Sequence, residues 1–119
     1  LDAHQPDEPV FLPGTINSRW GSWARYYCVT GNAQFAILFF KMYEANCDTK
    51  YLRSAMNLIE TVIRTQDIES GDPGINGAIP GSHPFDGKYQ KNKYPNWAAK
   101  FFADAIMRRK GLSDQFDMR

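Results

Sequence analysis

The sequence predicts an all-α domain made of antiparallel helical hairpins, with one long ordered loop. Three observations support this fold class. Residues 32–45 are apolar on nearly every side, which is typical of a helix buried by several neighbours. Residues 51–66 carry an apolar stripe opposite a polar face, which is typical of a helix that covers another and faces water. Residues 69–96 lack either period but contain enough apolar side chains for an ordered loop.

The chain before the first buried helix divides into two parts. Residues 1–14 are expected to form an extended N-terminal arm, because Pro6, Pro9 and Pro13 fix φ and disfavour helix in the residues before them. In residues 18–29 the apolar and aromatic positions recur at helical spacing, so we predict a short helix there. The sequence Thr-Gly-Asn that follows is expected to end this helix and to cap the next one.

The remaining helices form the body of the predicted domain, which spans residues 15–112. The short connection at residues 46–50, with Asp48 as N-cap, predicts that the two helices on either side pack as an antiparallel hairpin. A last helix is predicted over residues 97–110, where Gly111 would end it. Residues 113–119 are expected to form a frayed tail.

Composition excludes several classes of protein. The net charge of +1 arises from 14 basic and 13 acidic side chains that are scattered along the chain, so we expect no binding to nucleic acid. No apolar run reaches the roughly 18 residues of a membrane span. Cys28 and Cys47 fit neither a zinc motif nor a redox pair, and we expect free thiols. The chain begins with Leu1 and shows no secretory signal, so we expect the terminal piece of a longer polypeptide, with a processed product as the alternative, and predict no cellular location.

The predicted hairpin carries a resemblance to a known family. Residues 42–52, "MYEANCDTKYL", together with Ala55 and Gln66, resemble the hairpin unit of the α/α toroid proteins, the six-hairpin glycosidases and their relatives. In those proteins an inner helix ends in a "Y-E-x-T-G-D" turn and an outer helix begins with "Y-L". Here Asn46 and Cys47 stand where the typical turn has Thr and Gly.

Three further segments extend the resemblance to about residues 16–110. Residues 30–34, 77–82 and 94–105 are similar to the C-terminal part of uncharacterised bacterial toroid proteins of surface-polysaccharide gene clusters, often labelled prenyltransferase-like or squalene-cyclase-like. The resemblance implies a C-terminal piece of a toroid, with roughly two of about six hairpins. It also implies that the rest of a longer toroid, or a homo-oligomer, covers the apolar helix faces left exposed.

Aromatic side chains are the first candidates for a binding site. Flat aromatic faces stack on the apolar faces of sugar rings, and the clefts of toroid proteins concentrate such residues. The candidates are Trp20, Trp23, Tyr89, Tyr94 and Trp97. For each of them the alternative is a position in the core; the three-residue spacing of the first two also fits a buried helical stripe.

Polar candidates lie in the long loop. His83 could orient a sugar hydroxyl or act as a general base beside Asp86, and the alternative is a surface or packing histidine. Asp72 and Asp86 are the loop carboxylates available for glycoside chemistry, but nothing in the sequence pairs them, so whether the chain is an enzyme stays open. No histidine or cysteine spacing fits a metal site, and no glycine motif fits a phosphate loop, so no metal or cofactor is expected.

Together these observations predict a carbohydrate-associated domain that binds or processes a polysaccharide. Residues 71–94 and the tryptophans would form the wall of its cleft. One alternative is a prenyltransferase-like or terpenoid-cyclase-like toroid acting on an isoprenoid, although the acidic DDxxD and DxDD motifs of such enzymes are absent from this sequence. Another alternative is an interaction domain without catalysis. Convergent carboxylates and aromatic rings would favour the first function, and a closed apolar cavity the second.

Overall fold

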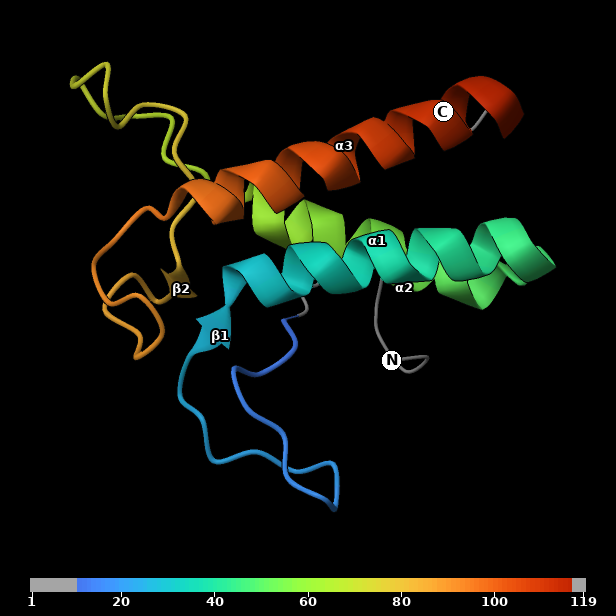
Figure 1. The fold of residues 1–119 in the computed structure, drawn as a ribbon, viewed down its shortest axis with the longest axis horizontal. Coiled ribbons are helices and arrows are strands. Elements are labelled where there is room, and N and C mark those ends of the chain that lie inside the picture. The colour runs from blue at the N-terminus through green and yellow to red at the C-terminus, as the bar shows by residue number, and fades with distance from the viewer. Residues whose placement is uncertain (1–10, 117–119) are drawn as a thin grey trace.

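The protein is mostly helical, as predicted. The computed structural model describes residues 11–116, and in Figure 1 its helices lie together while the other segments leave them at one end. The elements are β1 (Tyr27–Cys28), α1 (Val29–Asn46), α2 (Thr49–Ile63), β2 (Ser82–His83) and α3 (Asn96–Phe116). Residues 1–10 of the expected arm and 117–119 of the expected tail lie outside the described residues. No helix within residues 11–116 has the length and apolar character needed to cross a bilayer.

Helix α1 is the centre of the fold. It packs against both α2 and α3, whereas these two helices touch each other much less. The α1–α2 pair is the predicted antiparallel hairpin (Figure 1), and Asp48 caps α2 as expected, with its Oδ1 atom accepting a hydrogen bond from Lys50 N at 3.0 Å. Cys47 closes α1 in a left-handed conformation, and its N–H donates to Tyr43 O at 2.7 Å.

The core joins the three helices to the long loop. The main cluster of buried apolar residues contains Ala36, Phe39, Phe40, Ala55, Leu58, Ile59, Ala105 and Leu112. A second cluster contains Val29, Ala33, Val62, Ile79 and Ala98. Its Ile79 comes from the loop between α2 and α3 and is 2% exposed. Burial of this side chain anchors the middle of the loop against the helices.

Helix α1 begins earlier than predicted, and the expected break at residues 30–32 is wrong. Cys28 is the N-cap, and its Sγ atom accepts a hydrogen bond from Gly31 N at 3.3 Å. Asn32 is buried inside the helix instead of capping it. Its Nδ2 atom donates to Cys28 O at 2.8 Å and to Leu12 O at 3.0 Å, and its Oδ1 atom accepts from Leu12 N at 2.7 Å. A buried amide needs hydrogen-bond partners, and Asn32 finds them on the backbone of Leu12 and Cys28. The side chain of Asn32 therefore fastens the chain at Leu12 to α1.

The predicted short helix at residues 18–29 is also wrong. Apart from the start of α1 at Val29, this stretch is extended or turned and ends in β1 (Figure 1). Asn17 forms a tight turn in which its Oδ1 atom accepts hydrogen bonds from Arg19 N and Gly21 N, and Trp20 there has a φ of 64°. Asparagine side chains compete with helical hydrogen bonds in this way. Trp20 and Trp23 of the expected apolar stripe are almost fully exposed, so a short helix would bury little of their surface.

Helix α3 continues past the predicted stop at Gly111. The residue following this glycine, Leu112, is 2% exposed and belongs to the main core cluster. A glycine inside a helix costs about 1 kcal/mol, and burying a leucine side chain offsets that cost. Residues 113–116 of the expected tail are therefore helical as well.

The different surroundings of two α1 side chains give a test of this core. Phe40 is fully buried, so Phe40→Ala is expected to lower the free energy of unfolding by about 3–5 kcal/mol. Leu38 on the same helix is 46% exposed, and Leu38→Ala is expected to cost about 1 kcal/mol or less. Denaturant unfolding followed by circular dichroism measures both. Equal losses would contradict the packing described for α1.

Candidate functional site

An open hollow of about 940 Å³ lies between the C-terminal end of α2 and the long loop that leads to α3. Its walls are residues 63–70 on one side and Pro80, Ser82, His83, Phe85 and Tyr94 on the other. Two of the predicted site residues, His83 and Tyr94, therefore line one hollow. The carboxylates beside them belong to Asp67 and Glu69.

Asp67 holds this part of the loop in place. Its Oδ1 atom accepts hydrogen bonds from Ser70 N at 3.0 Å and Glu69 N at 3.2 Å, and its Oδ2 atom accepts one from the Tyr94 hydroxyl at 2.9 Å. The backbone of Asp67 pairs with residues 77–78. One residue thus connects the end of α2, the far side of the loop and the segment leading into α3.

The Asp67–Tyr94 hydrogen bond shifts the ionisation of both partners. Donation from the Tyr94 hydroxyl, assisted by the two backbone amides, lowers the pKa of Asp67 below its ordinary value of 3.8. Partial burial and then the neighbouring carboxylate raise the pKa of Tyr94 above its ordinary value of 10.0. The charged aspartate and the neutral tyrosine are therefore both favoured in the folded protein.

The turn between residues 66 and 78 depends on glycine at one position. Gly77 has a φ of +95°, where residues with a side chain are strained. Its carbonyl oxygen accepts a hydrogen bond from Gln66 Nε2 at 2.9 Å. Asp72, a candidate carboxylate, lies in the same turn and accepts a hydrogen bond from Gly74 N at 2.8 Å. Asp72 shapes its own turn and does not line the hollow.

Aromatic rings occur in two groups near the loop. Phe85 and Tyr94, which line the hollow, have ring centroids 4.9 Å apart. Trp97 Nε1 donates a hydrogen bond to the Tyr89 hydroxyl at 2.9 Å, which brings two further predicted site residues together at the start of α3. Neither member of this second pair is among the residues that line the hollow.

His83 lies at the junction of the loop and the N-terminal segment. It is opposite Tyr27 in the antiparallel β1–β2 pair, and its ring stacks on Phe11 with centroids 5.0 Å apart. Ser82 beside it is buried, and its hydroxyl donates to Tyr89 O. His83 thus has one face stacked and remains exposed beside the hollow, which fits a packing role as well as contact with a ligand.

Besides Tyr89 and Trp97, three predicted site residues lie apart from this hollow. Asp86 is exposed and makes no hydrogen bond or ion pair with a described residue, so the structure does not place it against His83 as a catalytic partner. Trp20 and Trp23 are 87% and 94% exposed. They belong to the excursion before β1, which Figure 1 shows on the opposite side of the helices from residues 67–78. These tryptophans are not in the core, which was the alternative for them.

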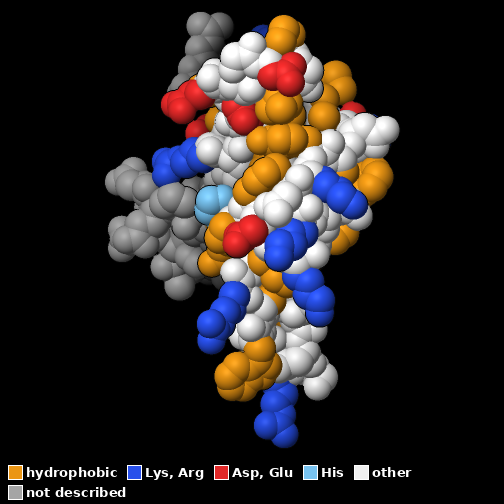
Figure 2. All heavy atoms as spheres, turned by 90° about the vertical axis from the view of Figure 1, so that its left-hand side faces the viewer, with side chains coloured by type: hydrophobic (Ala, Val, Ile, Leu, Met, Phe, Trp, Pro, Cys, Tyr) orange, Lys and Arg blue, Asp and Glu red, His pale blue; other side chains and the backbone are white. Residues whose placement is uncertain are grey.

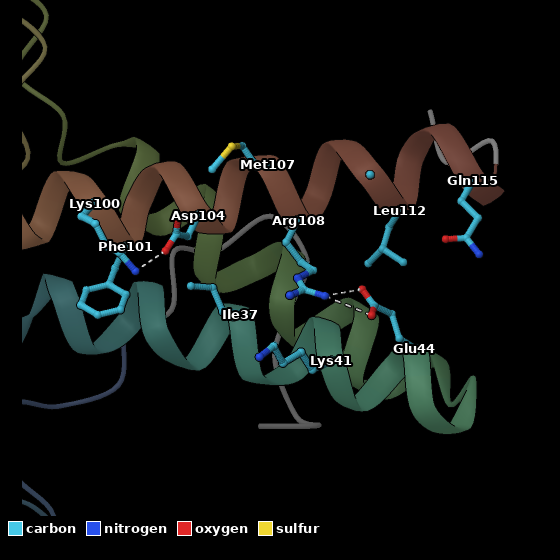
Figure 3. A pocket seen from close by; sticks show the side chains of 11 residues that line it. Ile37, Lys41, Glu44, Lys100, Phe101, Asp104, Met107, Arg108, Leu112 and Gln115 are labelled. Carbon is cyan, nitrogen blue, oxygen red and sulfur yellow. Dashed lines mark hydrogen bonds and ion pairs between the residues drawn. The ribbon is translucent and has the colours of Figure 1, made fainter.

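A second hollow of about 790 Å³ runs between α1 and α3 (Figure 3). Ile37 and Phe101 form part of its apolar surface. Most of its charged groups pair with each other: Arg108 Nη1 lies 3.1 Å from both carboxylate oxygens of Glu44, and the Lys100–Asp104 distance is 2.6 Å. Fewer polar groups are left to recognise a ligand here than beside β2.

Sequence reasoning missed the residues that organise the hollow beside β2, namely Asp67, Glu69 and Phe85. A usable signal for Asp67 was present. An aspartate just after the last apolar position of a helix, followed by polar residues and glycine, is typical of an Asx turn. The contact between Asp67 and Tyr94 joins positions 27 residues apart, and no local pattern predicts it.

Comparison with other proteins gives this site no precedent. No family model, no curated protein and no solved structure matches the chain. Within the described part of the chain, no cluster of three or more histidine, cysteine, aspartate or glutamate side chains could hold a metal ion. The function is therefore inferred from the geometry of the hollow.

The Asp67–Tyr94 bond predicts how stability depends on pH. Tyr94→Phe removes the donor, so we expect the variant to unfold more easily than the natural protein between about pH 4 and pH 10. As pH falls through the lowered pKa of Asp67, the folded natural protein takes up the proton that its unfolded chain already binds. The difference in free energy of unfolding between the natural protein and Tyr94→Phe then shrinks. As pH rises above 10.0, the unfolded chain loses the Tyr94 proton first, and the difference shrinks again.

Denaturant unfolding across this pH range measures the difference between the two proteins. Asp67→Asn should remove the acid limb of the curve, since an asparagine side chain does not titrate. A constant difference from pH 2 to pH 11 would contradict the assigned hydrogen bond.

Close packing at Gly87 predicts a second result. A Cβ atom there would lie 2.7 Å from both Ser82 Cβ and Tyr26 Cβ, so Gly87→Ala is expected to cost about 1–3 kcal/mol of stability. Gly71→Ala in the same loop is the matched control, because a Cβ there meets nothing within 4 Å. Thermal unfolding of both variants tests this. A Gly87→Ala protein as stable as its control would show that β1, β2 and the loop pack less closely than described.

Proposed function

We propose that this domain binds a polysaccharide chain, with sugar rings held in the hollow beside β2. The observation that carries the proposal is that an exposed aromatic ring and two carboxylates line one hollow. Phe85 is 40% exposed and lies against Tyr94, while Asp67 and Glu69 line the same hollow. Aromatic faces pack against the C–H faces of sugars, and carboxylates accept hydrogen bonds from sugar hydroxyls.

The proposal is for binding rather than for hydrolysis. Glycoside hydrolysis needs two carboxylates free to act as acid and as base or nucleophile. The Asp67 carboxylate already accepts hydrogen bonds from Glu69 N, Ser70 N and the Tyr94 hydroxyl. Glu69 has no side-chain partner among the described residues, which leaves it as the carboxylate available to a sugar hydroxyl.

We further propose that the three helices are a piece of an α/α toroid. In support, α1 is flanked by α2 and α3, yet Phe35 and Leu38 on α1 remain 43% and 46% exposed. An inner helix of a ring would present such side chains to further hairpins or to a second copy of the chain. The resemblance at residues 42–52 points the same way.

Calorimetric titration with a panel of soluble neutral and acidic oligosaccharides tests the binding function. We expect one sugar class to bind, and Phe85→Ala to weaken its affinity by about threefold to tenfold, as expected for the loss of a stacking ring. Glu69→Gln should weaken it as well. Met107→Ala is the matched control, because this side chain is 63% exposed in the α1–α3 groove.

Three results would contradict the proposal. The first is that a protein shown to be folded gives no heat of binding with any sugar. The second is that Phe85→Ala and Met107→Ala lower the sugar affinity equally. The third is that the protein binds farnesyl diphosphate and no sugar. The last result would favour the isoprenoid function.

A further inference from the structure

Five basic side chains on the two segments that contain β1 and β2 form no ion pair with any residue from 11 to 116. They are Arg19, Arg25, Lys88, Lys91 and Lys93, which we call the basic face. All five are exposed, and none forms an ion pair with a described residue. Ion pairs in the described part of the chain instead join charges of the helices and their caps, as in Arg108–Glu44 and Arg109–Glu60. Ion pairs within residues 11–116 therefore leave the positive charge near β1 and β2 unneutralised.

The net charge of +1 hides this separation of charge. Residues 11–43 contain no acidic side chain, and residues 73–103 contain Asp86 alone. The acidic residues Asp67, Glu69 and Asp72 instead follow the end of α2. The segments that carry the basic face thus contain one acidic side chain, Asp86, whereas three acidic side chains lie together after α2.

The two segments that carry the basic face meet in space. β1 pairs with β2, and Tyr26 lies so close to Gly87 that a Cβ atom there would be 2.7 Å from Tyr26 Cβ. Figure 2 views this side of the molecule. Lys and Arg side chains flank a run of hydrophobic side chains over its middle and lower part, while Asp and Glu gather mainly towards the top.

Exposed tryptophans extend this surface beyond the basic residues of the loop. Trp20 lies on the turn of residues 17–21 that Asn17 holds with two side-chain hydrogen bonds, and Trp23 follows this turn. Arg19 and Arg25 flank the two tryptophans in sequence. An aromatic side chain on a hydrogen-bonded turn loses little conformational entropy when it binds a ligand. Rings and cations together suit a polymer that offers both apolar faces and negative charges.

We propose that the ligand of this domain is an anionic polysaccharide, such as a uronic acid polymer, which extends from the hollow beside β2 across the basic face. This inference rests on the proposed polysaccharide-binding function and names its substrate class. The carboxylates Asp67 and Glu69 in the hollow favour such a polymer over a nucleic acid. Each sugar of such a polymer offers hydroxyl groups that can donate to these carboxylates, as well as a carboxylate for the basic face, whereas a nucleic acid offers mainly phosphates, which only accept hydrogen bonds.

The test compares two probes that share one sugar backbone, of which only the first is charged: oligogalacturonate and the same oligomer with its carboxyl groups methyl-esterified. We expect the natural protein to bind the charged oligomer at least about tenfold more tightly, since several surface charge pairs each contribute a little. The preference should shrink as salt is raised. Replacing all five basic-face residues by glutamine should remove it, whereas Lys41→Gln, an exposed lysine in the α1–α3 groove, should leave it unchanged.

The outcomes separate this inference from the function on which it rests. Equal affinity for both oligomers would overturn the anionic substrate class and leave polysaccharide binding standing. Binding of neither oligomer, nor of any sugar in the panel, would overturn both. If the protein binds single-stranded oligothymidylate or phosphatidylserine vesicles more tightly than oligogalacturonate, the basic face belongs to another partner. That result would also overturn the anionic polysaccharide as the ligand. The oligomer comparison uses the natural protein, so it holds even if the glutamine variant fails to fold.

Discussion

The hydrogen bonds of the Asp67 carboxylate hold the long loop between α2 and α3 in place. The loop between α2 and α3 spans residues 64–95 and has one two-residue strand of its own, so closing it costs chain entropy that local secondary structure does not repay. Asp67 offsets part of this cost at three places at once. Its Oδ1 atom holds the turn after α2, and its backbone forms hydrogen bonds with residues 77–78. Its Oδ2 atom accepts a hydrogen bond from the Tyr94 hydroxyl just before α3.

Burial supplies the second support of the loop. Ile79 enters the cluster formed by α1, α2 and the start of α3, and the β1–β2 pair connects the next residues to the N-cap of α1. On the other side of the fold, Asn32 fastens Leu12 to the same helix. The hollow beside β2 therefore has walls that are fixed to α1 and α2, although most of its residues lie outside any helix.

Periodicity predicted the helices well where an apolar stripe had a partner to cover. It found the hairpin and its Asp48 cap, because both are local features of a helix and its turn. It failed at residues 18–29, where Trp20 and Trp23 repeat at helical spacing but face water and Asn17 forms a turn instead. It also failed at Gly111, because the burial of Leu112 outweighs the cost of a glycine inside α3.

The candidate site was less predictable than the fold, for a physical reason. His83 and Tyr94 were found as polar and aromatic residues of a long loop, but their position beside Asp67 depends on contacts between distant parts of the chain. No local pattern indicates that Asp86 lies away from the hollow, or that the two segments carrying the basic face meet at β1 and β2. Both facts depend on contacts between distant parts of the chain.

We propose that the ligand binds at the loop that Asp67 fastens to the helices. Amide chemical-shift mapping of the natural protein during titration with oligogalacturonate tests it most directly. We expect shifts at residues 63–70, 81–85 and 94 that continue into the basic face, and little change at residues 37–44 and 104–115 in the α1–α3 groove. Shifts confined to that groove would contradict the claim.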